Sequence, residues 1–344
     1  MVVYPRGKFV RITIVGAGAM GSLLTARLIH AMAEGSTADS DQTIERVVLF
    51  GRPSEHLEEV AANGLTLTER DGTVRNWKIP VTSNPKDAEG SDLVVVLVKA
   101  WASAEAISPL RTVLNRDAVV LTLQNGLGNS ASLRSALLNE GVRPHVWLGV
   151  TTQAAIRTAP GHVTHTGAGI TAIGRRTSSA NSQLRQYGSV LSSADWQTVA
   201  VDDIHRWVWR KLAVNAAINP LTALAGVENS AIATDPALRQ AASALASEVV
   251  AVAEAHQVAI DRNEILAAVD DVARATGSNR SSMLVDLETG QRTEIDAING
   301  AVISEAIRVG VRVPANQLVT ALVRARERQN RANPLAAPVD VDSN

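Results

Sequence analysis

The sequence predicts an α/β protein in which a doubly wound, mainly parallel sheet is followed by an all-helical C-terminal domain. Three observations support this fold class. A glycine-rich turn follows a short apolar run near the N-terminus, β-prone and helical segments alternate over about the first 200 residues, and only helical periodicity remains after about residue 203. We therefore expect a first domain at 1–202, a helical second domain at 203–330 and a disordered tail at 331–344.

The first element is an apolar strand, residues 11–15, that runs directly into the turn GAGAMG. Its glycines have the G-x-G-x-x-G spacing, in which one makes the tight turn, one lets backbone approach a pyrophosphate and one lets the helix pack on the strand. The start of that helix would offer unpaired N–H groups to phosphates. We expect a Rossmann-like dinucleotide site here; a tight turn alone, or a site for another adenine-containing ligand, is the alternative. The expected cofactor-binding residues of this turn are Gly16, Gly18, Ala19, Met20 and Gly21.

Further apolar runs continue the expected parallel sheet. Because several of them are apolar throughout, we expect strands that helices cover on both faces. These strands are expected at 47–50, 93–98, 118–123 and 146–151. Two later β-prone runs, 161–166 and 170–173, are separated by glycines and predict antiparallel edge structure. The polar segment 33–43 predicts a surface insertion between the first helix and the second strand.

Segments with helical periodicity make up the predicted second domain, at 204–219, 236–256, 265–276 and 293–310. Asp235 precedes a first-turn proline and Asp261 lies three residues before Glu264, so both aspartates mark helix starts. Pro220 is expected to end or kink the first of these helices.

Composition and charge exclude several classes of function. The 344-residue chain has 33 Lys+Arg and 34 Asp+Glu, a net charge of -1 and no block of like charge, so binding to nucleic acid or to a membrane surface is not expected. The absence of cysteine excludes disulfides, thiol nucleophiles and cysteine metal ligands. No apolar run reaches the roughly 18 residues of a membrane span, and no signal-peptide pattern is seen, so the cytoplasm is the expected compartment.

The histidines give no indication of a metal site. His162 and His165 lie an odd number of residues apart on an expected strand and would face opposite sides, so they should not bind one ion. The motifs H-E-x-x-H and G-x-S-x-G are absent from the sequence, so neither metal-dependent nor serine hydrolysis is expected. No bound metal is expected.

A polar stripe marks the first predicted helix of the second domain. Lys211, Asn215 and Asn219 recur every four residues and therefore share one face of a helix that is otherwise apolar. One interpretation is a lysine that lines a cleft, with amide neighbours that hold hydroxyls or a carbonyl. The alternative is a partly exposed lysine with two structural asparagines.

Two further groups of residues are candidates for chemistry. Ser282 and Asp286 lie one helical turn apart, and Glu294 is expected to open the next helix, although each also fits a cap or a surface carboxylate. The glycine-rich segment QNGLG, residues 124–128, follows an expected strand, and Lys99 follows another. Open α/β sheets bind ligands at such carboxyl ends of strands.

These residues together resemble the ketopantoate reductase (2-dehydropantoate 2-reductase) family, over about residues 10 to 328. The matching segments are GAGAMG at 16–21, Lys99, QNGLG at 124–128, WRKLAVNAAINPLTAL at 209–224 and SSMLVDLETGQRTEIDAINGAV at 281–302. One departure concerns the segment after Lys99. The family often has Lys-Thr-x-Gln, whereas Ala100, Trp101 and Ala102 follow here, which leaves a side-chain contact near the nicotinamide open.

The resemblance implies NADPH-dependent reduction of 2-dehydropantoate to pantoate, on the route to pantothenate and coenzyme A. It implies that Lys211 and Glu294 are the catalytic residues, with Lys211 as the general acid and Glu294 as the carboxylate that supports substrate binding. The substrate-side positions that it implies are Asn125, Asn215, Asn219, Asn229, Asn279 and Ser282. The cofactor-side positions are Arg52, Lys99 and Asn125. The helical domain would bind the substrate, and a homodimer that it mediates is one expected assembly.

The chemistry of the reaction fits a buried lysine. Hydride transfer to a ketone builds negative charge on the carbonyl oxygen, which a preorganised cation or proton donor stabilises. A solvated lysine has a pKa of about 10.4, which is high for proton donation near neutral pH. Burial on an apolar helix would lower the pKa of Lys211, and Glu294 nearby would raise it. Lys211 would thus polarise the ketone and protonate the alkoxide.

NADPH is expected rather than NADH because of the residues after the second strand. An acid there usually binds the ribose 2′-hydroxyl of NAD, but residues 47–50 are followed by Gly51 and Arg52, with no acid until Glu55. A guanidinium suits a 2′-phosphate, although Arg52 also fits a solvated loop residue. Two alternatives to the whole function remain: reduction of another small 2-oxo acid, or a dinucleotide-sensing protein without turnover.

Overall fold

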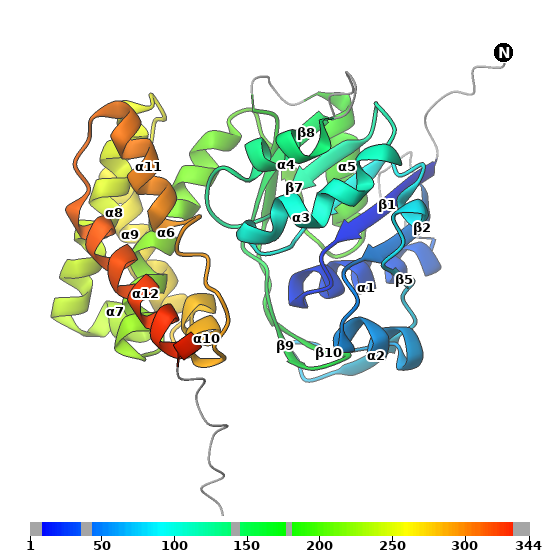
Figure 1. The fold of residues 1–344 in the computed structure, drawn as a ribbon, viewed down its shortest axis with the longest axis horizontal. Coiled ribbons are helices and arrows are strands. Elements are labelled where there is room, and N and C mark those ends of the chain that lie inside the picture. The colour runs from blue at the N-terminus through cyan, green and yellow to red at the C-terminus, as the bar shows by residue number, and fades with distance from the viewer. Residues whose placement is uncertain (1–8, 36–42, 139–144, 177–180, 333–344) are drawn as a thin grey trace, which may run out of the picture. The chain divides into compact units, whose positions relative to one another are not determined.

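The computed structural model describes residues 9–35, 43–138, 145–176 and 181–332. The chain divides into two compact units, of which unit 1 contains 1–124 and 128–204 and unit 2 contains 125–127 and 205–344. Figure 1 colours unit 1 from blue to green and unit 2 mainly from light green to red. The short segment 125–127 is notable because it follows a strand of unit 1 but belongs to unit 2.

Unit 1 is built on an eight-stranded sheet (Figure 1). Its strands are β1 (Phe9–Val15), β2 (Thr43–Phe50), β5 (Val81–Thr82), β6 (Leu93–Val96), β7 (Val119–Thr122), β8 (His145–Thr151), β11 (Thr171–Gly174) and β12 (Thr198–Ala200). Their order across the sheet is β12-β11-β8-β7-β6-β1-β2-β5. Neighbouring strands pair in parallel, except that β11 and β8 are antiparallel.

Helices cover both faces of this sheet. They are α1 (Ala19–Ala33), α2 (Glu55–Asn63), α3 (Ser103–Ile107), α4 (Asn129–Leu137) and α5 (Ser182–Ser193), with short 3-10 turns at Pro85–Ala88, Ala100–Ala102 and Ser108–Thr112. Leu93 and Val95 of β6 share a core cluster with α1 and α5, whereas Val94 and Val96 share another with α3 and α4. Because successive side chains of a strand point to opposite faces, the sheet is doubly wound.

A separate four-stranded sheet of unit 1 corrects the predicted edge structure. Its strands are β3 (Leu65–Thr68), β4 (Val74–Trp77), β9 (Ala154–Ala159) and β10 (His162–Gly167), in the order β4-β3-β10-β9. The run 161–166 corresponds to β10, an inner strand that is antiparallel to β9 and parallel to β3. The run 170–173 corresponds to β11, which lies inside the main sheet between β8 and β12. Each run has an antiparallel neighbour, as predicted, but neither is an edge strand. The edge part of the prediction is wrong because mostly exposed, weakly β-prone segments such as β9 form the outer neighbours.

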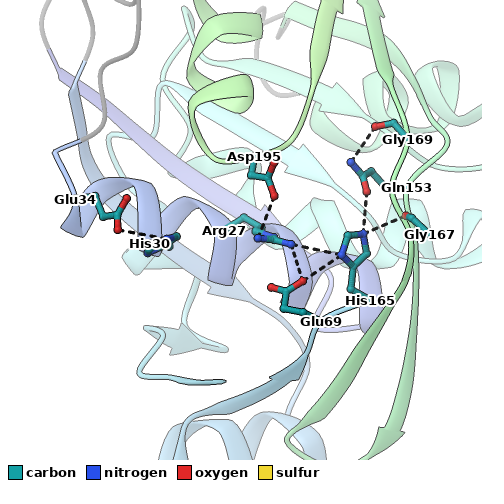
Figure 2. A network of polar contacts seen from close by, with 9 residues as sticks. All are labelled: Arg27, His30, Glu34, Glu69, Gln153, His165, Gly167, Gly169 and Asp195. Atoms are coloured by element: carbon teal, nitrogen blue, oxygen red, sulfur yellow. Dashed lines mark hydrogen bonds and ion pairs between the residues drawn. The ribbon is translucent and has the colours of Figure 1, made fainter. Parts of the chain in front are cut away.

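Polar side chains join α1 to this second sheet (Figure 2). Arg27 of α1 donates from Nη2 to Oε2 of Glu69 at 2.7 Å. The His165 ring lies with Nδ1 3.3 Å from Oε2 of Glu69 and Nε2 3.2 Å from Oε1 of Gln153. His165 is buried and His162 is exposed, so the two face opposite sides of β10, as their spacing predicts.

Unit 2 is a bundle of helices, which confirms the predicted fold class. Its helices are α6 (Ile204–Ala225), α7 (Ser230–Thr234), α8 (Pro236–Ala255), α9 (Arg262–Ala275), α10 (Ser282–Glu288), α11 (Asn299–Val309) and α12 (Pro314–Ala332). They enclose one core cluster. The side chains of Asp235 and Asp261 accept backbone N–H bonds at the starts of α8 and α9, which confirms both predicted helix starts. Within the described residues, no helix is long and apolar enough to cross a membrane.

Helix α6 does not end at Pro220 but continues to Ala225. A proline has no N–H, so position 220 cannot donate to the carbonyl of Ala216 four residues earlier. The Asn299 side chain donates to that carbonyl instead, with 3.0 Å between Nδ2 and the oxygen. Another element of unit 2 thus supplies the donor that the proline lacks.

The helix predicted from residue 293 begins only at Asn299, as α11. Residues 294–298 precede it as a bend and a turn, in which the Glu294 carbonyl accepts from the N–H groups of Ala297 and Ile298 at 3.0 Å. The Thr293 N–H and hydroxyl both donate to Oε1 of Glu327 on α12, each at 2.7 Å. These bonds to a distant helix hold Thr293 outside α11, and Glu294 therefore lies on a turn and not in the first helical turn.

Two predicted segments lie partly outside the described residues. Helix α12 runs to Ala332, so the first two residues of the predicted tail are helical, while 333–344 lie outside the described residues. Of the predicted insertion, Ala33 ends α1 and Thr43 begins β2, whereas 36–42 lie outside the described residues.

Candidate functional site

The glycine-rich turn of unit 1 is crowded at two of its glycines and open at the third. Gly16 has φ +118°, and a Cβ added there would lie 2.8 Å from Val98 Cγ1. A Cβ at Gly21 would overlap the Gly16 carbonyl oxygen, so α1 starts tightly against the turn. Gly18, in contrast, has no heavy atom within 4 Å of an added Cβ. It lies at the N-cap of α1, where backbone N–H groups have no helical partner, so this open face fits a pyrophosphate.

Two basic residues lie at the same edge of the sheet as this turn. Val15 pairs with the last residue of β2 and with the last residue of β6, so the three parallel strands end together. Arg52 follows β2 and is exposed, and its Nη1 lies 3.1 Å from Oε1 of Glu105 on α3. Lys99 follows β6 and precedes the 3-10 turn Ala100–Ala102. Arg52 and Lys99 are therefore placed where an open α/β sheet binds ligands.

The segment after β7 connects this edge to unit 2. Gln124 donates from Nε2 to the Val98 carbonyl at 2.9 Å and to Ser103 Oγ at 2.7 Å, which ties the end of β7 to the segment after β6. The next residue, Asn125, belongs to unit 2. The sequence indicates this segment as a ligand-binding loop, but nothing local in it indicates that Gln124 and Asn125 serve different units.

Helix α6 presents the predicted polar stripe. Between residues 211 and 220, every residue is buried except Lys211 and Asn215, which are partly exposed. Asn219, the third member of the stripe, is 8% exposed. A helix that is buried nearly all round is a core helix, and Lys211 and Asn215 mark its open side.

Lys211 belongs to a short chain of hydrogen bonds within unit 2. Its Nζ donates to Oδ1 of Asn125 at 2.8 Å, and Nδ2 of Asn125 donates to Oε2 of Glu294 at 2.9 Å. The amide can serve both partners in this orientation alone, because only then does its oxygen face the ammonium and its NH₂ group face the carboxylate. The structure thus brings together three predicted site residues that lie far apart in the sequence.

The surroundings lower the pKa of Lys211. The surrounding protein removes water from the Lys211 ammonium and so lowers the pKa of Lys211 to about 8, while the negative charge of Glu294 acts in the opposite sense and raises it. Glu294 itself is buried, with 6% of its surface exposed. An ammonium with a pKa near 8 is still protonated at neutral pH and releases its proton far more readily than a solvated lysine.

Gly126 and Leu127 place Asn125 within unit 2. Leu127 donates its backbone N–H to the Ala297 carbonyl at 2.9 Å. Gly126 has φ +81°, and a Cβ there would overlap the Ala297 carbonyl oxygen. Only glycine therefore lets this segment lie against the turn that carries Glu294. A glycine directly after Asn125 is a signal in the sequence, but the contact with Ala297 is not.

The other predicted substrate residues lie at two neighbouring connections of unit 2. Asn229 precedes α7, and its N–H donates to the Asn279 carbonyl at 3.0 Å. The Asn229 side chain is 8% exposed and donates to Thr276 Oγ1 at 2.9 Å. Ser282 is exposed and is the first residue of α10. Asn229 is thus bonded to the segment that precedes α10.

Ser281, a residue that the sequence interpretation missed, joins α10 to α6. Its Oγ accepts from Leu284 N–H as the N-cap, and the Thr222 hydroxyl donates to it at 2.8 Å. It is buried, whereas its neighbour Ser282 is exposed. Across the ranges that the structure describes, no group of three His, Asp or Glu side chains is arranged to hold a metal ion.

Comparisons with known proteins identify relatives over most of the chain. The family profile described as "Ketopantoate reductase PanE/ApbA" matches residues 12–178, and "Ketopantoate reductase PanE/ApbA C terminal" matches 203–327. The 2-dehydropantoate 2-reductase of Halobacterium salinarum is 36% identical over 318 residues, which cover 92% of this chain and 99% of that protein. That of Pyrococcus horikoshii is 32% identical over 317 residues, covering 92% and 97%.

Solved structures agree with the fold. A PanE/ApbA family ketopantoate reductase from Ralstonia eutropha superposes with a TM-score of 0.81 at 28% identity, covering 93% of this chain and 99% of that one. A D-mandelate dehydrogenase, solved with NADH and anilino(oxo)acetate, superposes with a TM-score of 0.82 at 24% identity over the same shares. At that identity the second likeness is one of fold alone.

Proposed function

Because the chain belongs to the ketopantoate reductase family, we propose that it reduces 2-dehydropantoate to pantoate with NADPH, a step toward pantothenate and coenzyme A. The observation that carries the proposal is the hydrogen-bond chain from Lys211 through Asn125 to Glu294. Unit 1 would serve as the dinucleotide-binding domain and unit 2 as the substrate domain. Dimerisation through unit 2 stays a prediction.

Lys211 is the general acid in this proposal. NADPH, when bound, supplies the hydride. The Lys211 ammonium donates a hydrogen bond to the ketone oxygen, stabilises the charge that develops there, and gives its proton to the alkoxide. Asn125 holds the ammonium through Oδ1, and Glu294 fixes the orientation of Asn125 through Nδ2. Glu294 therefore acts on the proton donor through an intervening amide.

The remaining polar residues would bind the substrate. Asn215 and Asn219 follow Lys211 along the same face of α6, and their amides suit a hydroxyl or a carbonyl oxygen. The Ser282 hydroxyl suits the substrate carboxylate, with Asn229 and Asn279 at the neighbouring connections. A hydrogen bond to a charged group of this kind contributes about 1.5–3 kcal/mol.

The cofactor would bind at the glycine-rich turn. Gly16, Gly18 and Gly21, with Ala19 and Met20, would place the start of α1 against the pyrophosphate. The open space at Gly18 and the crowding at Gly16 and Gly21 support this fit. Arg52 would bind the 2′-phosphate and Lys99 would lie on the cofactor side, together with Asn125.

The pH dependence of ketopantoate reduction tests the proposed function. Because the donor must be protonated and the pKa of Lys211 is about 8, kcat/KM should fall about tenfold per pH unit above that pH. In Glu294→Gln the charge that raises the Lys211 pKa is lost, so the fall should begin at lower pH. The exposed Glu254 of α8 is the matched control, and Glu254→Gln should keep the original profile. A wild-type chain without turnover contradicts the function, and an unmoved profile in Glu294→Gln contradicts the coupling.

The choice of cofactor is tested at Arg52. Arg52→Ala should weaken NADPH binding roughly tenfold to a hundredfold, because it removes charge-assisted bonds to the 2′-phosphate, and should change NADH binding little. It should also flatten the salt dependence of NADPH binding. Arg111, an exposed arginine of unit 1, provides the control variant Arg111→Ala. Equal affinity of the unmodified protein for NADPH and NADH, measured by titration, would contradict the preference for NADPH that we assign to Arg52.

A further inference from the structure

Pro220 leaves a gap in the hydrogen bonds of the helix that carries Lys211. In an α-helix each N–H donates to the carbonyl four residues earlier, and proline has none to donate. Pro220 lies inside α6, so the Ala216 carbonyl has no donor at position 220. Ala216 is fully buried. A buried carbonyl without a donor would cost free energy, so the helix needs a substitute at this point.

Asn299 supplies that substitute. Its Nδ2 donates to the Ala216 carbonyl at 3.0 Å and also to Oδ1 of Asn316 at 2.9 Å. The Asn316 amide in turn donates to Oε2 of Glu248 at 2.8 Å, which turns its oxygen toward Asn299. Asn299 and Asn316 are both fully buried. The donor for α6 is thus oriented by α12 and α8 and is not left to rotate.

The gap lies at a position that matters for the site. The Ala216 carbonyl lies between Asn215 and Asn219 along α6, so the bond from Asn299 contacts the helix within the polar stripe. Asn299 also begins α11 directly after the turn that carries Glu294. Its bond to Ala216 therefore joins the helix of Lys211 to the segment of Glu294, the two ends of the hydrogen-bond chain.

We propose that Asn299 is a positioning residue for the reaction, which replaces the N–H that Pro220 lacks and holds Lys211, Asn219 and Glu294 in register. This inference rests on the proposed function for its catalytic consequence. The proposed role differs from a purely structural one in what it predicts. The defect of Asn299→Ala should be specific to the gap at Pro220, and restoring a backbone donor there should remove the need for Asn299.

A double-mutant cycle between positions 220 and 299 tests this. Asn299→Ala should lower kcat for ketopantoate at least tenfold. In Pro220→Ala, residue 220 again has an N–H that can donate to the Ala216 carbonyl. Adding Asn299→Ala to that variant should therefore lower kcat by less than about threefold. Val323→Ala, which removes fully buried methyl groups from α12 in the same unit, controls for lost stability and should keep kcat.

A second readout needs no turnover. The chain has only five lysines, so Lys211 can be followed by NMR of Cε-labelled lysine and assigned from the signal lost in Lys211→Ala. Loosening of α6 should move the titration of Lys211 toward that of a solvated lysine in Asn299→Ala, and Pro220→Ala should restore it in the double variant. A wild-type chain that does not turn over would overturn the proposed function, while this titration would still test the inference.

The cycle also has outcomes that overturn the inference. Wild-type kcat and Lys211 titration in Asn299→Ala would show that the bond positions nothing. Asn299→Ala can be added to the wild-type chain or to Pro220→Ala. An equal loss of kcat in the two cases, or failure of both resulting variants to fold, would show that Asn299 does not act by replacing the missing N–H. If Asn299→Ala alone fails to fold, the comparison of Pro220→Ala with the double variant carries the test, and a loss above tenfold there overturns it.

Discussion

Replacing Lys211 by alanine is expected to lower kcat for ketopantoate reduction by about 10²- to 10⁴-fold, the range that general acid catalysis contributes. The loss should fall on kcat because the ammonium acts on charge that is present chiefly in the transition state. NADPH affinity should stay nearly unchanged, since the glycine-rich turn belongs to unit 1 and Lys211 to unit 2. Steady-state kinetics and NADPH titration of the same preparation measure both.

The control for this variant is another lysine. Lys86 is exposed in unit 1, so Lys86→Ala should keep the kinetics of the unmodified chain. If Lys211→Ala retained most of its kcat, Lys211 would have no part in the proton transfer. If instead KM rose with kcat unchanged, the lysine would only bind the substrate.

The second large effect is expected at Gly126. Gly126→Ala should lower kcat at least tenfold, because its Cβ would overlap the Ala297 carbonyl oxygen and displace the segment that holds Asn125. Its φ of +81° adds strain for any other residue. With Asn125 displaced, the ammonium of Lys211 would lose its link to Glu294. We expect the kinetic loss to come with an altered pH profile.

A control variant at Gly128 separates the two causes of the expected loss, which are the overlap with the Ala297 carbonyl and the backbone strain. It has φ +85°, but nothing lies within 4 Å of an added Cβ. Gly128→Ala therefore carries the backbone strain without the overlap, and should change kcat little. It should lower the melting temperature by no more than Gly126→Ala does. Equal kinetic losses in the two variants would mean that strain alone explains the effect and that the contact with Ala297 does not position Asn125.

Features fixed by local spacing could be predicted from the sequence. The glycine-rich turn needs only six neighbouring residues, and the repeat of four places Lys211, Asn215 and Asn219 on one face wherever the helix packs. The helix starts at Asp235 and Asp261 depend on a side chain and the next few N–H groups. In all of these cases the residues that interact are close in sequence.

Features that depend on distant residues could not be predicted. Helix α11 starts late because Thr293 is bound by Glu327, 34 residues away, a contact that apolar periodicity does not contain. The same limit applies to Pro220, because the Ala216 carbonyl that the proline leaves without a donor accepts from Asn299, 83 residues away. Asn125 and Glu294 lie 169 residues apart, so only the family resemblance assigned both to one site, and their hydrogen bond needed the structure.

The central claim is that this chain transfers hydride from NADPH to ketopantoate, and its most direct test is the loss of NADPH absorbance with a panel of 2-oxo acids. We predict turnover with ketopantoate at a kcat/KM well above that for pyruvate, 2-oxobutyrate and 2-oxoisovalerate, and well above that with NADH. A higher kcat/KM for another acid would leave the chemistry in place but contradict the substrate. NADPH binding without consumption by any member of the panel would contradict the claim itself and would favour a dinucleotide-sensing protein.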